Sequence, residues 1–83
     1  MNTELENDIN EIYDQKIEYY FEHRGIFFTR ILFENKDAFK NAFEDSLLKW
    51  NKRLRLWEVF GTTEDELKEY GLVSLERAKN FLA

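Results

Sequence analysis

The 83-residue sequence contains no cysteine, no proline and only three glycines. Without cysteine, the chain forms no disulfide and offers no thiolate nucleophile or thiolate zinc ligand. No apolar run approaches the ~20 residues that cross a bilayer. The polar start, Met1 to Glu4, lacks the basic and apolar parts of a signal peptide. We therefore expect a cytoplasmic protein that makes no membrane contact.

The chain is rich in aromatic and acidic residues. Hydrophobic residues make up 43% and aromatic residues 17% of the chain, so side chains alone can build a core, each aromatic ring burying roughly 150–250 Å². At this length we expect residues 1–83 to form a single domain. The formal net charge is −5, which disfavours non-specific binding to nucleic acid or to anionic membranes.

The N-terminal part of the chain has helical periodicity. Thr3 and Glu6 have the spacing of a capping box, and apolar residues then recur at helical intervals. We therefore predict a helix over about 3–23, a break at Gly25 and a short buried helix over 26–34. The segment 17–33 is also rich in β-branched and aromatic residues, which strands prefer. The alternative is an α+β fold with a β-hairpin at about 17–33.

A longer helix is predicted over 37–60, with Asp37 as its cap and Gly61 just past its end. Its apolar stripe at three- and four-residue steps comprises Phe39, Phe43, Leu47, Trp50, Leu54 and Trp57.

Two short helices should follow this central helix. Thr63 and Glu66 repeat the capping-box spacing before a helix that stops at Gly71, and Ser74 can cap a last helix. The predicted fold class is therefore all-α, a small helical bundle of about four to five helices around a long central helix.

Catalytic chemistry has little support in the sequence. His23 is the only histidine, and on a helix it points about 100° away from Glu22. The three glycines are too widely spaced for a phosphate loop. We expect no enzymatic activity, no cofactor and no bound metal.

A basic segment over 49–55 stands out in this acidic chain, with four bases and no acid. On the predicted helix, apolar residues outside the main stripe lie near these bases, as in a contact surface. The alternative is a solvated helix face whose apolar residues pack in the core. A helix with two apolar faces also predicts a homodimer. The candidate partner-binding residues are Leu48, Lys49, Lys52, Arg53, Arg55, Leu56 and Val59.

Acidic residues on the first predicted helix form another candidate surface, able to contact a basic partner or to imitate a phosphate backbone. The alternative is a face that only keeps the protein soluble. The residues of this acidic face are Glu4, Asp8, Glu11, Glu18 and Glu22.

Together these features predict a small non-catalytic accessory, inhibitor or adaptor protein that binds a protein partner or itself. Small acidic helical proteins of this kind are common in phages and other mobile elements. The alternative is a nucleic-acid-binding protein that places the 49–55 bases on phosphate groups.

Overall fold

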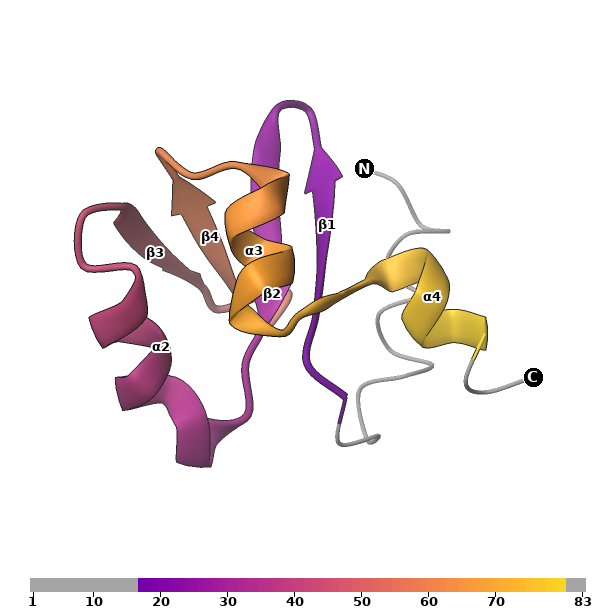
Figure 1. Ribbon diagram of the computed structural model, residues 1–83, viewed down its shortest axis with the longest axis horizontal. Coiled ribbons are helices and arrows are strands. Elements are labelled where there is room, and N and C mark those ends of the chain that lie inside the picture. Colours follow the sequence, from indigo (N-terminus) through magenta and orange to yellow (C-terminus); the bar gives the residue numbers. More distant parts are fainter. Residues whose placement is uncertain (1–16, 81–83) are drawn as a thin grey trace.

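A computed structural model describes residues 17–80, which form a five-stranded mixed sheet with short helices around it (Figure 1). The strand order is β3-β4-β2-β1-β5, and only β5 pairs with its neighbour in parallel. The predicted all-α helical bundle is therefore wrong, and the α+β alternative is confirmed. The strands are β1 (Tyr19–His23), β2 (Ile26–Arg30), β3 (Leu47–Asn51), β4 (Leu56–Phe60) and β5 (Val73–Ser74). The helices are η1 (Phe33–Asn35, a 3-10 turn), α2 (Lys36–Ala42), α3 (Glu64–Tyr70) and α4 (Leu75–Asn80).

The segment 17–33 contains the β1–β2 hairpin and not the two helices that periodicity favoured. Its two-residue turn has positive φ at both positions, 54° at Arg24 and 80° at Gly25, as the type I′ hairpin turn requires. Three consecutive β1 residues, Tyr19, Tyr20 and Phe21, are buried. A continuous apolar run of this kind suits a strand that is covered on both faces. Residues 1–16 of the predicted first helix lie outside the described residues.

The predicted helix over 37–60 is also wrong. Helix α2 ends at Ala42, and after a turn at 43–46 the residues 47–60 form the β3–β4 hairpin. The hairpin turn begins at Asn51, whose side-chain carbonyl accepts a hydrogen bond of 2.9 Å from the backbone N–H of Leu54. Asn side chains favour such turns by bonding their own backbone. Arg55 then takes a left-handed conformation with φ of 59°, which a helix excludes.

Two predicted helix starts in the C-terminal third are confirmed. The Thr63 hydroxyl accepts a hydrogen bond from the N–H of Glu66 at the start of α3, and α3 ends at Gly71 with φ of 115°. The Ser74 hydroxyl accepts a hydrogen bond from the N–H of Arg77 at the start of α4. These two signals act on backbone groups within one turn. The predicted cap at Asp37 is wrong, because Asp37 lies inside α2, whose N-cap residue is Asn35.

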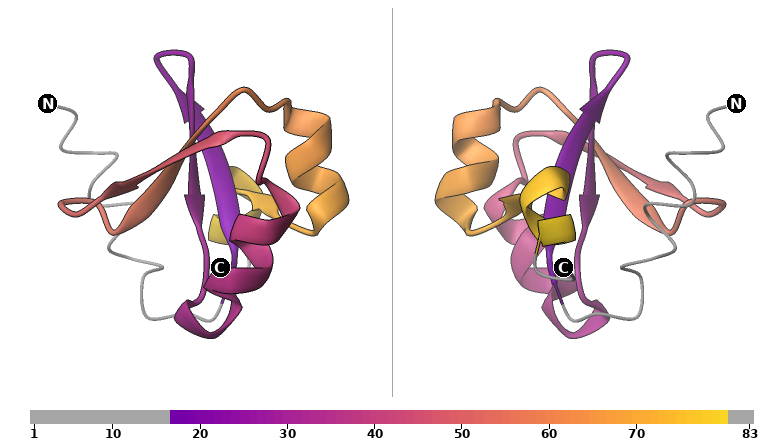
Figure 2. Two further views of the ribbon diagram at one scale, coloured as in Figure 1. Left: turned by 90° about the vertical axis from the view of Figure 1, so that its left-hand side faces the viewer. Right: turned by 90° about the vertical axis from the view of Figure 1, so that its right-hand side faces the viewer.

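Helices α2 and α3 lie on the same side of the sheet (Figure 2), whereas α4 follows β5 beside β1 (Figure 1). Side chains alternate between the sheet faces, and each face carries its own buried cluster. The cluster under α2 and α3 contains Tyr20, Phe39, Phe43, Val59, Leu67 and Leu72. The other contains Tyr19, Phe21, Phe28, Leu56, Leu75 and Ala78.

Candidate functional site

An open groove of about 610 Å³ lies between α2, the segment that follows β2, and the β3–β4 hairpin. The sheet contributes Trp50 and Trp57, which are paired across β3 and β4, and α2 contributes Lys36 and Lys40. Four basic residues and no acidic residue line it, although the Arg30 guanidinium is bonded to the Ile17 carbonyl. The lining comprises residues 30–33, Lys36, Lys40, Trp50, Arg55 and Trp57. We call this site the basic aromatic groove.

Three aromatic residues, Phe33, Trp50 and Trp57, line the groove. Trp50 and Trp57 are directly paired across β3 and β4, so both project from the same sheet face. Their ring centroids lie 5.1 Å apart with the planes tilted by 58°. Trp50 remains 47% exposed and Phe33 83% exposed. Large apolar groups that stay this exposed are typical of contact surfaces.

Two lysines of α2 accompany these rings. The ammonium of Lys40 lies 5.0 Å from the Trp57 ring centroid, and that of Lys36 lies 5.0 Å from the Phe33 centroid. Both distances are within the ~6 Å range of cation–π attraction. Lys36 also lies 3.7 Å from the exposed carboxylate of Asp37, a surface pair that contributes little. The lysines thus hold positive charge beside aromatic faces.

The segment that follows β2 is held in place by Glu18. Its carboxylate accepts a hydrogen bond of 3.0 Å from the backbone N–H of Leu32 and one of 3.2 Å from the Asn35 amide. The Arg30 guanidinium donates a 2.9 Å hydrogen bond to the carbonyl of Ile17. Glu18, predicted to lie on an acidic face, therefore supports one edge of the groove. Charge-assisted bonds of this kind are stronger than neutral ones.

The predicted partner-binding residues do not form one surface. Leu56 and Val59 are 1% and 2% exposed and belong to the clusters on opposite faces, because strand neighbours three apart point in opposite directions. Leu48 is half-buried against the cluster under α2 and α3. The other four, Lys49, Lys52, Arg53 and Arg55, are exposed, and of these Arg55 lines the groove.

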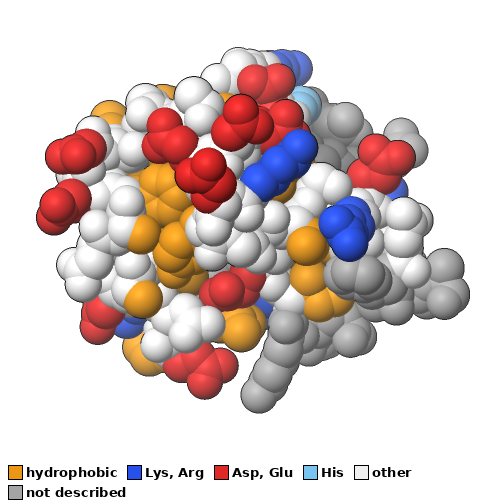
Figure 3. All heavy atoms as spheres, in the orientation of Figure 1, with side chains coloured by type: hydrophobic (Ala, Val, Ile, Leu, Met, Phe, Trp, Pro, Cys, Tyr) orange, Lys and Arg blue, Asp and Glu red, His pale blue; other side chains and the backbone are white. Residues whose placement is uncertain are grey.

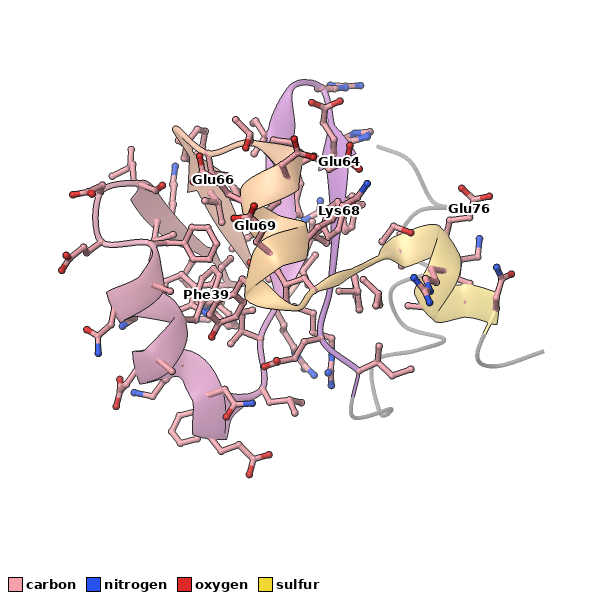
Figure 4. The ribbon with its side chains drawn as sticks, viewed as in Figure 1. Phe39, Glu64, Glu66, Lys68, Glu69 and Glu76 are labelled. Carbon is pink, nitrogen blue, oxygen red and sulfur yellow. The ribbon has the colours of Figure 1, made fainter. Side chains whose placement is uncertain are left out.

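The predicted acidic face is only partly described. Glu4, Asp8 and Glu11 lie outside the described residues, and Glu22 is exposed on β1. A different acidic surface covers α3, where Figure 3 shows acidic side chains gathered. Figure 4 places labelled glutamates along α3, with another on α4. The exposed acids of α3 are Glu64, Asp65, Glu66 and Glu69.

A second hollow, of about 650 Å³, lies between α3 and α4. Its lining mixes acids with bases, including Glu64, Lys68 and Arg77. The Tyr20 hydroxyl at its floor donates a 2.8 Å hydrogen bond to Glu64. Burial, and then that bond and the charge of Glu64, raise the pKa of Tyr20 to about 12. This hydroxyl therefore stays protonated at neutral pH and ties α3 to the sheet.

Sequence reasoning missed most of the basic aromatic groove. It assigned Trp50 and Trp57 to a helical core stripe and did not single out Phe33, Lys36 or Lys40. The pair Phe33 and Lys36 carries a weak signal, because an aromatic and a base stand three residues apart. Nothing in the order of residues shows that α2 lies beside the β3–β4 hairpin.

The groove residues can supply aromatic surface and positive charge. Within residues 17–80, no three side chains of His, Asp or Glu come together as metal ligands do. In the same range no helix has the length and apolar character to cross a membrane. Comparisons with protein-family models, curated proteins and solved structures find no match for this chain.

Proposed function

We propose that this protein is a small non-catalytic interaction protein that binds an anionic macromolecule through the basic aromatic groove. One observation carries the proposal: exposed aromatic rings share an open groove with the ammonium groups of Lys36 and Lys40, and no acidic residue lines that groove. The chain as a whole carries a net charge of −5, so a groove lined by basic and no acidic residues is a positively charged site on an acidic protein.

Binding energy and orientation come from different parts of this site. Exposed tryptophan is the residue type most often found at energetic hot spots, because it buries a large rigid surface at little entropic cost. Charges at the rim steer a partner of opposite charge and repel the wrong one. The acids on α3 and the bases of the groove orient an asymmetric partner.

Capture of partners from the native host tests this proposal. The tagged full-length protein should retain one or more partners identified by mass spectrometry. Lys40→Glu should lose them, because it places an acid beside Trp57. Lys68→Glu makes the same charge change at an exposed position of α3 and is the matched control. Equal capture by wild type and Lys40→Glu would overturn the proposal.

Self-association is a second candidate function, favoured by the exposed edge of the sheet. Within residues 17–80, β3 pairs only with β4, and Leu47 on this edge is 67% exposed. An open edge strand is a template for pairing with another chain. The homodimer predicted from the sequence was to share a central helix over 37–60. The structure has no helix over that whole span, so this argument for a homodimer no longer applies.

Light scattering over a range of concentrations tests the edge-strand candidate. The wild type should become dimeric as concentration rises, and Leu47→Lys should stay monomeric, because lysine blunts strand edges. Leu47→Val keeps an apolar β-former and should still dimerise. A wild type that stays monomeric throughout excludes this candidate.

A further inference from the structure

We infer that the basic aromatic groove binds single-stranded nucleic acid, with bases stacked on Trp50 and Phe33 and phosphates paired with Lys36 and Lys40. This inference rests on the proposed function and names the partner class of the same groove. Three features of the groove support it: the exposed ring faces, the placement of the lysines and the distribution of charge over the rest of the described surface.

The two rings come from separate elements and are exposed to solvent, with the Lys36 ammonium over one face of Phe33. Trp50 projects from β3 and is 47% exposed, whereas Phe33 projects from η1 and is 83% exposed. The Trp57 ring packs beside that of Trp50, with centroids 5.1 Å apart and planes tilted by 58°. Base stacking on such rings tolerates any sequence, because every base has a π face.

The lysines lie where phosphates of a stacked strand would pass. Lys36 and Lys40 stand four residues apart on α2, and side chains with this spacing lie on one side of a helix. Each ammonium is 5.0 Å from a ring centroid. A nucleotide whose base stacks in the groove therefore brings its phosphate near a lysine, and two such lysines can pair with two successive phosphates of one strand.

Stacking on the rings of Trp50 and Phe33 distinguishes a single-stranded nucleic acid from other polyanions. In a duplex, base faces are stacked on each other and cannot reach a ring. A peptide of acidic residues satisfies the lysines but offers no aromatic rings to stack on Trp50 and Phe33. The groove volume of about 610 Å³ falls within the ~300–1,000 Å³ of sites that enclose one small molecule. It therefore suits a few nucleotides.

The distribution of acids directs a polyanion to this groove. The acids of α3 cover another part of the described surface (Figure 3), and they repel phosphate there. A long duplex that lies across the molecule meets this repulsion. A short single strand held in the groove avoids it.

Fluorescence anisotropy with labelled single strands of about ten nucleotides tests the inference on the full-length protein. Oligothymidylate and oligouridylate are the two probes, and preference for one assigns the natural ligand to DNA or RNA. We expect both to bind at low salt, and a blunt duplex of equal length to bind at least about tenfold more weakly. Affinity should fall as salt rises, because phosphate pairing releases counterions.

Matched variants separate stacking from charge. Trp50→Ala should weaken binding about tenfold or more with little change in salt dependence, and Trp50→Phe should restore most of the affinity. Lys36→Ala and Lys40→Ala should each lower the slope of log affinity against log salt by about 0.7. Lys68→Ala should match wild type. Near-ultraviolet circular dichroism establishes that each variant is folded, and Trp50→Phe with the lysine variants keeps the test valid if Trp50→Ala unfolds.

Each outcome decides between the two proposals. Equal affinity for duplex and single strand, or an unchanged affinity in folded Trp50→Ala, would overturn the stacking inference. A polyglutamate peptide of equal length is the third probe. Binding of polyglutamate without binding of either oligonucleotide overturns the nucleic-acid inference but leaves the proposed function intact. Failure of all three probes, with host partners retained by Lys40→Glu, overturns both.

Discussion

The hydroxyl of Tyr20 in β1 donates a hydrogen bond of 2.8 Å to the carboxylate of Glu64 in α3. The residue before it, Tyr19, is equally buried on the opposite face. Its hydroxyl has no hydrogen-bond partner among the described residues. Two adjacent tyrosines of one strand, buried in different clusters, thus differ in whether the hydroxyl is hydrogen-bonded, and removing each hydroxyl measures that difference.

Removal of each hydroxyl should have opposite consequences. Tyr20→Phe loses the bond to Glu64 and should lower the free energy of unfolding by about 1 kcal/mol, the typical net value of a hydrogen bond. Tyr19→Phe removes a buried polar atom without a partner, so stability should be unchanged or increased. Urea denaturation of the two variants and wild type measures the difference. A larger loss for Tyr19→Phe would contradict the assignment.

The same tyrosines predict an alkaline loss of stability. Burial raises the pKa of Tyr19 to about 12, against a lowering by Arg30, and the pKa of Tyr20 is also about 12. In the unfolded chain both pKa values return to about 10, so between these values the unfolded state binds fewer protons than the folded state. Stability is therefore fully present below pH 10 and falls as pH rises through 12.

Denaturation midpoints measured across this pH range, with tyrosinate absorbance followed in parallel, test the alkaline prediction. Tyr20→Phe should show a shallower fall than wild type, because one of the tyrosines with a raised pKa is gone. Identical pH profiles would place the alkaline transition on other groups.

Phe39 should be the key core residue of α2. It is fully buried and contacts the rings of Phe43 and Tyr70, with centroids 5.0 and 5.8 Å away. Phe39→Ala should destabilise the protein by about 3–5 kcal/mol, because it removes a large buried group and leaves a cavity. Phe33→Ala, at an exposed position nearby, should change stability by no more than about 0.5 kcal/mol. Thermal unfolding compares the two, and similar losses would mean that α2 is not anchored by Phe39.

The start of α3 should depend on one hydroxyl. Thr63 accepts a hydrogen bond from the N–H of Glu66, so Thr63→Ala should lower stability by about 1 kcal/mol. Thr63→Ser keeps the acceptor and should stay near wild type. Denaturant midpoints of the three proteins provide the measurement, and a loss in Thr63→Ser equal to that in Thr63→Ala would argue against capping.

Sequence patterns predicted the short-range features well and the central span badly. The capping residues Thr63 and Ser74 act on backbone groups within one turn, so their effect does not depend on distant contacts. The hairpin at 17–33 was visible only as an alternative, because its apolar residues also continue a helical spacing. For 37–60 the helical spacing was wrong. Apolar residues are so dense in this span that a set at three- and four-residue steps can be found even though part of the segment forms strands.

The candidate site was less predictable than the fold. The basic segment 49–55 directed attention to the hairpin turn, and Arg55 does line the groove. Its partners Lys36 and Lys40 come from α2, and their position beside Trp57 depends on how α2 packs on the sheet. Leu56 and Val59 were expected to lie on one surface, but the pleat of β4 sends them to opposite faces.

By itself, the sequence determined a net acidic chain without cysteine or proline, the caps of α3 and α4, and the glycine that ends α3. These features depend on composition or on hydrogen bonds between near neighbours. Only the tertiary structure decided that 47–60 is a hairpin. An isolated segment can satisfy its backbone hydrogen bonds equally well as a helix, whereas here the pairing of β4 with β2 satisfies them in a sheet. The same pairing decided that Trp50 and Trp57 face the lysines of α2.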